Sequence, residues 1–262
     1  MISLWKNREL IWQFTLRAVE LRHKGSHLGL IWSFLHPLLM LAMYIFVFGY
    51  IFDGSFKVIP NETRMDYGLG IFLGLTLYHF AAEVIANSGA IILSNPNFVK
   101  KVVFPLEVLP VANVMAAFFH LLISLTMVFT GIALLGPGLM ASAAWLPVIV
   151  LPLLLLTLGI SWLLSALGVF FRDTIQITQF LGTALMFASA VFYSAQRIPP
   201  EAWTFLRFNP LLLAIEQARD TALWGRPANL HHIGYLYVCG IVVFFCGHAA
   251  FRRMKPAFAD VL

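Results

Sequence analysis

The chain has 262 residues, of which 60% are hydrophobic and only 11% are charged, and its mean hydropathy is +0.86. A soluble domain is nearer half apolar and about a quarter charged, so these proportions exclude a water-soluble globular protein and indicate a polytopic membrane protein. The net charge of +5 does not indicate a nucleic-acid partner, because Lys and Arg stand at the margins of apolar runs and form no basic patch.

Residues 1–27 are too highly charged for a signal peptide and predict an amphipathic helix at the membrane interface. At helical spacing, a polar stripe of roughly 80° holds Lys6, Glu9, Gln13, Arg17, Glu20 and Lys24. Apolar residues, among them two tryptophans, cover most of the remaining surface. A soluble helix packed on a partner is the alternative. The membrane surface is favoured because a long apolar run follows directly.

The stretch 28–195 contains five apolar runs, and each is long enough to cross a bilayer, for which about 20 residues suffice. The predicted spans are 28–52, 67–93, 106–135, 143–171 and 174–195. A polar loop at 53–66 follows the first span, and a loop at 94–105 with Lys100 and Lys101 follows the second. The fourth and fifth spans are joined by a very short turn at Arg172 and Asp173.

Residues 196–230 predict two short helices, each begun by proline and the second closed by glycine, which is the usual punctuation of a helix. Neither is long enough to span, so both are expected to be re-entrant or interfacial on the outer side, where protein or water meets their backbone. The residues that mark this hairpin are Pro199, Trp203, Asn209, Pro210, Glu216 and Arg219.

A sixth span is predicted at 231–251, followed by a basic tail at 252–262. With both termini in the cytosol, the cytosolic segments hold most of the 17 Lys and Arg residues, in agreement with the positive-inside rule. The whole chain, 1–262, is therefore expected to form one all-α membrane domain of six spans.

The chain lacks motifs that would power or catalyse a reaction. No Lys is followed by Ser or Thr, so a phosphate-binding loop of the form GxxxxGK[ST] is absent. No His or Cys spacing indicates a metal site, and no catalytic residues or bound cofactor are predicted. Glu83 and His79 stand four apart and are expected to form a structural pair, with a proton relay as the alternative. His36 and His120 are expected to pack between helices.

The sequence is rich in aromatic residues, with 24 Phe, 7 Tyr and 7 Trp. Most are expected to face lipid or neighbouring helices. A conduit for sugars would also use aromatic rings, which stack on the apolar faces of pyranoses. The residues proposed to line such a channel are Trp32, Tyr44, Phe48, Tyr78, Phe192 and Tyr193.

Three stretches resemble the permease subunits of ABC-2 type polysaccharide exporters. LRHKGSHLGLIWSFLHPLL at 21–39 is similar to the opening signature of that family, although His36 stands where Asn or Glu is more usual. NPNFVKKVVFPLEVLP at 95–110 resembles the cytosolic loop before the third span. SAVFYSAQRIPPEAWTFLRFNPLLLAIEQARD at 189–220 resembles the re-entrant hairpin, with Asn209, Pro210, Glu216 and Arg219 as its most specific part.

The resemblance implies a homodimer in the bacterial inner membrane, with a channel for a lipid-linked polysaccharide at the dimer interface. Two copies of a separate ATP-binding subunit would dock beneath it and hold ATP and Mg, so this chain would not be an enzyme. The residues implied to receive the ATPase stroke are Arg17, Arg22, Lys24, Asn97, Lys100, Lys101, Arg172 and Asp173. The re-entrant pieces would gate the outer mouth.

Other functions remain open at this point. Among ABC-2 permeases, O-antigen exporters resemble the chain most, while permeases for teichoic acid, capsule, small lipids or drugs share much of the pattern. A flippase or ion-coupled transporter that uses Glu83 without ATP is a separate class. A membrane-embedded glycan-processing enzyme would need a pair of acidic residues near its substrate, and the sequence offers none.

Overall fold

The computed structural model describes residues 6–23, 29–100 and 104–262. Within these ranges the chain is helical and has no β-strand, which confirms the predicted all-α membrane fold. The α-helices are α2 (Arg8–His23), α3 (Trp32–Tyr44), α4 (Arg64–Ser88), α5 (Pro96–Lys100), α6 (Val108–Leu135), α7 (Leu146–Phe170), α8 (Thr174–Ala188), α9 (Pro200–Leu206), α10 (Pro210–Ala222), α11 (Leu230–Met254) and α12 (Phe258–Val261). Shorter helical turns are η1 (Gly29–Ile31), η3 (Ala141–Trp145), η4 (Ala195–Arg197) and η5 (Lys255–Ala257), and η2 (Ile45–Ile51) is a π-helix that continues α3.

Five helical segments of the described ranges are long and apolar enough to cross a membrane. They are Trp32–Ile51, Arg64–Ser88, Val108–Leu135, Ala141–Phe170 and Leu230–Val261. The fifth predicted span is represented by α8, which has 15 residues. A helix of that length is about 22 Å long and shorter than the about 30 Å of a hydrocarbon core. The count of six spans therefore stays a prediction.

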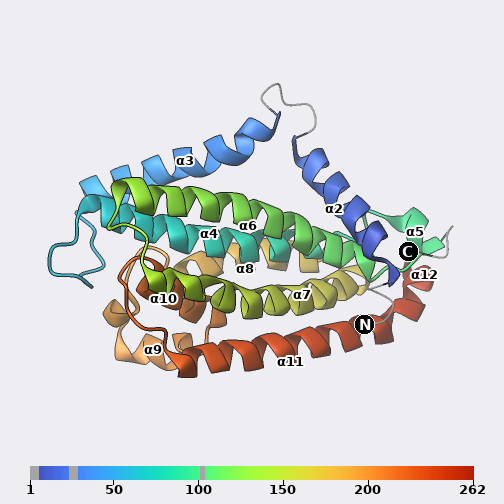
Figure 1. The fold of residues 1–262 in the computed structure, drawn as a ribbon. Helices are drawn as coiled ribbons and strands as arrows, with labels where there is room; N and C mark the ends of the chain where they lie inside the picture. Colours follow the sequence, from blue (N-terminus) through green and yellow to red (C-terminus); the bar gives the residue numbers. More distant parts are fainter. Residues whose placement is uncertain (1–5, 24–28, 101–103) are drawn as a thin grey trace.

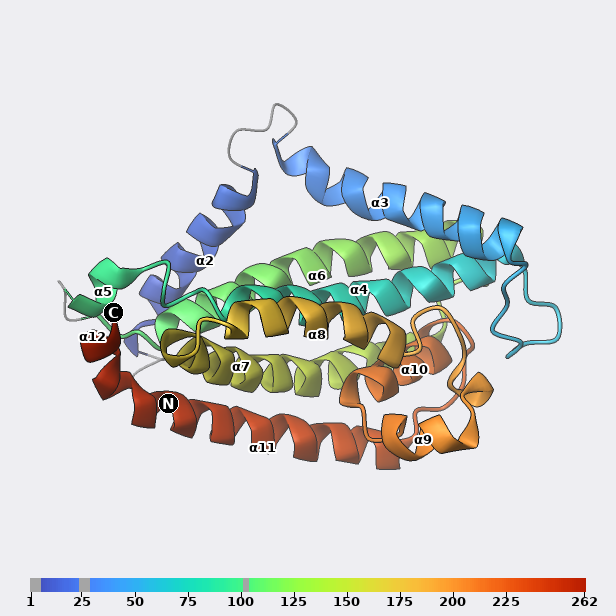
Figure 2. The same cartoon turned by 180° about the vertical axis from the view of Figure 1, so that it is seen from behind.

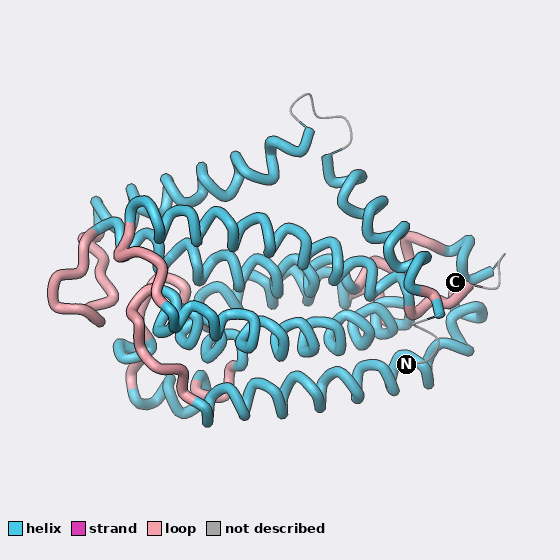
Figure 3. Tube along the Cα trace, viewed as in Figure 1, coloured by secondary structure: helices cyan, strands magenta, loops and turns pink. Residues whose placement is uncertain are grey.

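The long helices run roughly parallel or antiparallel, and loops and turns gather at the two ends of the bundle (Figures 1, 2 and 3). One end, here the terminal end, carries α5, α12 and the start of α2. The other, here the hairpin end, carries α9, α10 and the loop that precedes α4. Helix α4 lies in the middle of the bundle and packs against α6, α7, α8 and α10. Helix α11 lies along α7.

Helices α4 and α3 differ sharply in burial. In α4, 78% of the most apolar 18-residue window is buried inside the chain, whereas the corresponding figure for α3 and η2 is 6%. Helix α3 contacts α4 and α6, yet it diverges from them toward its N-terminus (Figures 1 and 2). Most of the apolar surface of α3 must therefore be covered by lipid or by another protein chain.

Close backbone approach explains the tight pairing of α7 and α11. A Cβ atom added to Gly159 would meet the backbone of Val243, and one added to Gly247 would meet the backbone of Gly159. Small residues let membrane helices approach closely, and dispersion contacts then hold them together where no water is available to drive association. The two helices lie side by side on the side of the bundle away from α3 (Figures 1 and 2).

The predicted amphipathic helix is present as α2. Thr15 and Val19 are buried on the side that packs against α6, while Glu9, Gln13 and Arg17 are exposed. This alternation is the pattern of a helix with one covered face. Its place at a membrane interface stays a prediction.

Two segments are more regular than the sequence suggests. The loop 94–105 contains the short helix α5, which begins at Pro96, a residue that favours the first helical position. The tail 252–262 extends α11 to Met254 and then forms η5 and α12. The side chain of Phe258 is fully buried against Phe251 and Phe170, so the tail is fixed to the bundle by aromatic packing.

Candidate functional site

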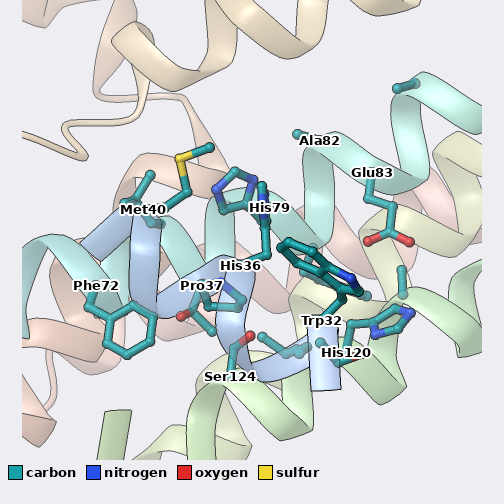
Figure 4. A pocket seen from close by; sticks show the side chains of 17 residues that line it. Trp32, His36, Pro37, Met40, Phe72, His79, Ala82, Glu83, His120 and Ser124 are labelled. Atoms are coloured by element: carbon teal, nitrogen blue, oxygen red, sulfur yellow. The ribbon is translucent and has the colours of Figure 1, made fainter. Parts of the chain in front are cut away.

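A cavity of about 570 Å³ lies between α3, α4 and α6 (Figure 4). It is half open and is situated where α3 diverges from the bundle. The residues that line it are Trp32, Ser33, His36, Pro37, Met40, Phe72, Leu75, Thr76, His79, Phe80, Ala82, Glu83, Ala86, Ala117, His120, Leu121 and Ser124.

Helical spacing brings the polar side chains of this cavity together. Residues three or four apart share one face of a helix, and this spacing places Trp32, His36 and Met40 on one face of α3. The same rule puts Thr76, His79 and Glu83 on the face of α4 that looks toward α3, and His120 and Ser124 on α6. Figure 4 shows the Glu83 carboxylate and the His120 imidazole on one side of the Trp32 indole, with His36 and His79 on the other.

The interpretation of His36 and His120 as isolated packing residues missed this convergence. Each stands alone in its own span, and no local pattern relates residues of three different helices. The predicted pair of Glu83 and His79 does share a face and a cavity. The sequence did carry one sign of this cavity: each of the first three predicted spans contains one histidine, namely His36, His79 and His120.

The predicted channel aromatics divide into one cluster and several separate positions. Phe48 stacks on Phe192 with a centroid separation of 4.6 Å, and Tyr44 lies 5.1 Å from Phe192. Trp32 lines the cavity described above. Tyr78 is buried and donates its hydroxyl hydrogen to the carbonyl of Gly182 at 3.0 Å, so it ties α4 to α8.

Tyr193 packs apart from the other predicted channel residues. Its hydroxyl donates to the carbonyl of Phe187, and its ring contacts the apolar cluster between α10 and α11. Among the ring contacts of the described residues none joins Tyr193 to Tyr44 or Phe48, so its role in a channel stays a prediction.

The exposed face of α8 combines polar and aromatic side chains. Gln176, Gln179 and Thr183 are exposed on the same face as Phe180 and Phe187. Polar side chains are costly at a lipid-facing position of a membrane helix and usually face protein or a water-filled cavity. This face of α8 is therefore unsuited to lipid along part of its length.

Arg219 is the centre of the hairpin end. Its side chain is 0% exposed, and its guanidinium lies 4.4 Å above the ring of Phe56. It donates hydrogen bonds to the carbonyls of Gly70 at 2.9 Å and Ala190 at 2.7 Å, and also to the carbonyl of Val191. One residue of α10 thus holds both α4 and the backbone just after α8.

Glu216 supplies the counter-charge for this buried cation, with 3.3 Å between its Oε1 atom and Nη1 of Arg219. Burial lowers the pKa of Arg219 to about 10, while the neighbouring carboxylate acts in the opposite direction. Burial also raises the pKa of Glu216, and Arg219 opposes that shift. The two charges compensate each other in a site that excludes water.

Asn209 joins two helix ends. Its Nδ2 atom donates to the carbonyl of Ala188 at 3.0 Å, at the end of α8. Its Oδ1 atom accepts from the backbone N–H groups of Leu211 and Leu212, which are unpaired donors in the first turn of α10. Pro210 follows at the first helical position, where its missing N–H costs nothing.

The first re-entrant piece packs less tightly. Trp203 is half-buried against the cluster between α10 and α11, and Pro199 is exposed at the start of α9. The structure therefore brings Asn209, Glu216 and Arg219 together in one network and leaves Pro199 and Trp203 at its edge.

The predicted coupling residues that can be described lie at the terminal end. Arg17, Asn97, Lys100, Arg172 and Asp173 are all exposed there. Lys24 and Lys101 lie outside the described residues, and Arg22 lies in α2 with its side chain outside them.

Aromatic rings join the two predicted coupling segments. Phe98 of α5 stacks on Phe104 at 4.6 Å, and Phe14 of α2 meets both rings at 5.5 and 5.3 Å. Beside them, the Lys255 ammonium lies 3.0 Å from the carboxylate of Glu107 and ties the C-terminal tail to the start of α6. A movement of α5 would consequently reach α2 and α6 directly.

Metal chemistry has no support in the described ranges, where no three His, Cys, Asp or Glu side chains are grouped to hold an ion. The histidines and the carboxylate of the α3–α4–α6 cavity are included in that statement.

Comparison with known proteins gives a consistent result. Residues 9–223 match the family model for ABC-2 type transporters. An O-antigen export system permease protein, RfbA, from Klebsiella pneumoniae is 31% identical over 97% of this chain and 95% of its own length. RfbA from Myxococcus xanthus is 25% identical over 98% and 97% of the two chains. The polysialic acid transport protein KpsM of Escherichia coli is 23% identical over 92% of each.

Proposed function

This chain belongs to the ABC-2 type transporter family, and from that premise we propose that it is the membrane-spanning subunit of an ATP-driven exporter of a lipid-linked polysaccharide, O-antigen, across the bacterial inner membrane. The observation that carries the proposal is similarity over almost the whole chain to O-antigen export permeases. The similarity includes α5, which would contact an ATPase, and the re-entrant hairpin, which would lie at the outer face.

A second copy of the chain would complete the transport path. The polar stripe of α8 (Gln176, Gln179 and Thr183) needs a covering that lipid supplies poorly, and the exposed apolar surface of α3 can be covered by protein as well as by lipid. A homodimer that paired these faces would enclose a channel with few charges. Tyr44, Phe48 and Phe192 would offer aromatic rings to the apolar faces of sugars in that channel.

The terminal end would face the cytosol and receive two copies of an ABC ATPase, which would hold ATP and Mg. Arg17, Lys100 and Arg172 are exposed there and give it a basic surface. The ring contacts of Phe14, Phe98 and Phe104 would carry a push on α5 into α2. At the other end, the hairpin held by Arg219 would frame the outer mouth and act as its gate.

Co-purification tests this proposal. The full chain, tagged and extracted in mild detergent from its native host, should bring down an ATPase with a phosphate-binding loop in about equal amount. Deletion of the gene for this chain should leave lipid-linked glycan inside the cell, and restoring it should return glycan to the surface. A chain that purifies alone and moves glycan in vesicles without ATP would instead support the ion-coupled alternative at Glu83.

The substrate is tested separately from the mechanism. If the deletion leaves O-antigen at the surface and removes capsule, teichoic acid or a small lipid instead, the exporter assignment stands and the substrate assignment fails. The polysialic acid relative makes capsule the first of these alternatives to examine.

A further inference from the structure

We propose that the α3–α4–α6 cavity is a saccharide site that binds one sugar unit of the transported glycan as it enters the protein. The inference rests on the proposed function and adds to it a place of recognition, separate from the Tyr44, Phe48 and Phe192 cluster. Its volume of about 570 Å³ lies within the about 300–1,000 Å³ of small-molecule sites.

The cavity extends from the middle of the bundle toward the terminal end, which the glycan would enter first: its lining residues on α4 run from Phe72 to Ala86, two residues before the end of the helix. Glu83 stands five residues before Ser88, the last residue of α4, which is about 7.5 Å along the helix axis. Along α3 the cavity is bounded by Trp32 to Met40, in the N-terminal part of the helix, which diverges from α4 and α6 (Figure 1). A ligand could reach it from that side without crossing the buried core around α4.

The side chains of the cavity suit a neutral polyhydroxyl ligand. A pyranose has an apolar face and a rim of hydroxyl groups that both donate and accept. Trp32 supplies a large flat ring, and its side chain is 40% exposed within the chain. Glu83 supplies a carboxylate acceptor, while His79 and His120 can donate or accept (Figure 4). All four lie around one space.

Thr76 provides an independent observation. Its residue is only 4% exposed, it lines the cavity, and its Oγ1 atom has no hydrogen-bond partner in the described chain. Other helical threonines, such as Thr126 and Thr221, donate to the carbonyl one turn earlier. A buried hydroxyl without a partner costs roughly 1–3 kcal/mol, and a hydroxyl group of a ligand would remove that cost.

Other ligand classes fit less well. The carboxylate of Glu83 would repel a phosphate or another anion. Imidazoles and a carboxylate can bind transition metals, so what decides the metal alternative is how closely the side chains are grouped. The metal alternative has no support among the described side chains. A hydrocarbon tail would desolvate Glu83, Thr76 and the imidazoles without replacing their hydrogen bonds.

Photocrosslinking in cells that make the glycan and the ATPase tests the proposal with the natural substrate. The photoreactive residue p-benzoylphenylalanine is placed at Met40 in the cavity, at Gln179 on the exposed face of α8, and at Leu134, which is 76% exposed at the hairpin end. We expect glycan adducts at Met40 and Gln179 and none at Leu134. The Met40 adduct should disappear when Trp32→Ala is added.

The outcomes separate the two proposals. Adducts at Gln179 without any at Met40 would overturn the saccharide site and leave the exporter function intact. Absence of adducts at both positions, in variants that reach the membrane, would overturn both.

Export rates give a second readout that a proton relay would not reproduce. Trp32→Ala should lower the rate of glycan export about tenfold, whereas Trp32→Phe, which keeps a ring, should stay within about threefold. Thr76→Val should lower it about threefold, with Thr126→Val as the matched control because the Thr126 hydroxyl is already paired. If Glu83→Gln abolishes export while Trp32→Ala is tolerated, the cavity is a proton path and the saccharide site is excluded.

Discussion

The two ends of the bundle are held together in different ways. At the hairpin end one fully buried cation, Arg219, binds three backbone carbonyls and a carboxylate. At the terminal end the fully buried Phe258 fixes the tail, but α2 and α5 are joined through the partly buried rings of Phe14, Phe98 and Phe104. The Lys255 side chain, paired with Glu107, is 33% exposed. A segment fixed by buried polar bonds has one arrangement, whereas we expect α2 and α5, joined by partly buried rings, to shift when a partner pushes on them.

The largest expected effect is at Arg219. Arg219→Met should lower the free energy of unfolding by about 3–5 kcal/mol, because it leaves Glu216 buried without a counter-charge and removes the donors of three carbonyls. Denaturant unfolding of the purified chain in detergent measures this. The matched control is Arg226→Met, whose ion pair with Asp220 is partly exposed and should contribute about 1 kcal/mol or less. Equal effects of the two variants would remove the contrast between a buried and an exposed cation.

A smaller effect is expected at Phe98. Phe98→Ala removes a stacked and an edge-on ring contact and should cost about 1–3 kcal/mol. It should also raise the rate of protease cleavage in 94–105, since α5 loses its hold on α2. Phe205→Ala is the control, because that ring is 79% exposed at the hairpin end. If cleavage is unchanged, rings do not hold the terminal end.

Charge reversal at the proposed docking surface should act on binding and leave folding unchanged. We expect Lys100→Glu combined with Lys101→Glu to weaken association with the ATPase about tenfold, which corresponds to about 1.4 kcal/mol. Co-purification yield and glycan export measure it, with Lys57→Glu plus Arg207→Glu as the charge-matched control at the hairpin end. Normal export by the first double variant would show that the coupling surface lies elsewhere.

The smallest effect is expected at the ion pair of the tail. Lys255→Ala should change the free energy of unfolding by about 1 kcal/mol or less, because the Lys255 side chain is 33% exposed, whereas that of Arg219 is 0% exposed. A loss greater than about 3 kcal/mol would place this pair with Arg219 and contradict the comparison between the two ends.

Hydropathy alone predicted most of the long helices. The bounds of α6 and α7 differ from the predicted 106–135 and 143–171 by three residues or fewer. Helix α4 begins slightly before the predicted residue 67 because Thr63 and Asp66 form a capping box, which a hydropathy profile does not register.

What the sequence did not reveal depends on contacts between distant segments. The apolar run 174–195 continues past Ala188, but the helix ends there, and Asn209 and Arg219 bind the carbonyls of Ala188 and Ala190. The cavity was missed for the same reason, since His36, His79 and His120 are brought together only by packing. Sequence periodicity predicts which residues share a face of one helix, but it does not predict which faces of three helices pack together.

The hydrogen bonds from Arg219 to the backbone after α8 have a consequence for synthesis, because the end of the fifth apolar segment can be fixed only after α10 has been made. Ala190 has a left-handed backbone with φ of +53°, an arrangement that costs a non-glycine residue roughly 1–3 kcal/mol unless its surroundings hold it. The arginine that holds it lies 29 residues further along the chain. While that arginine is still untranslated, the fifth apolar segment has no means of ending as it does in the finished protein. We therefore expect the translocon to retain this segment until α10 emerges, and a series of nascent chains of increasing length would locate the point of release.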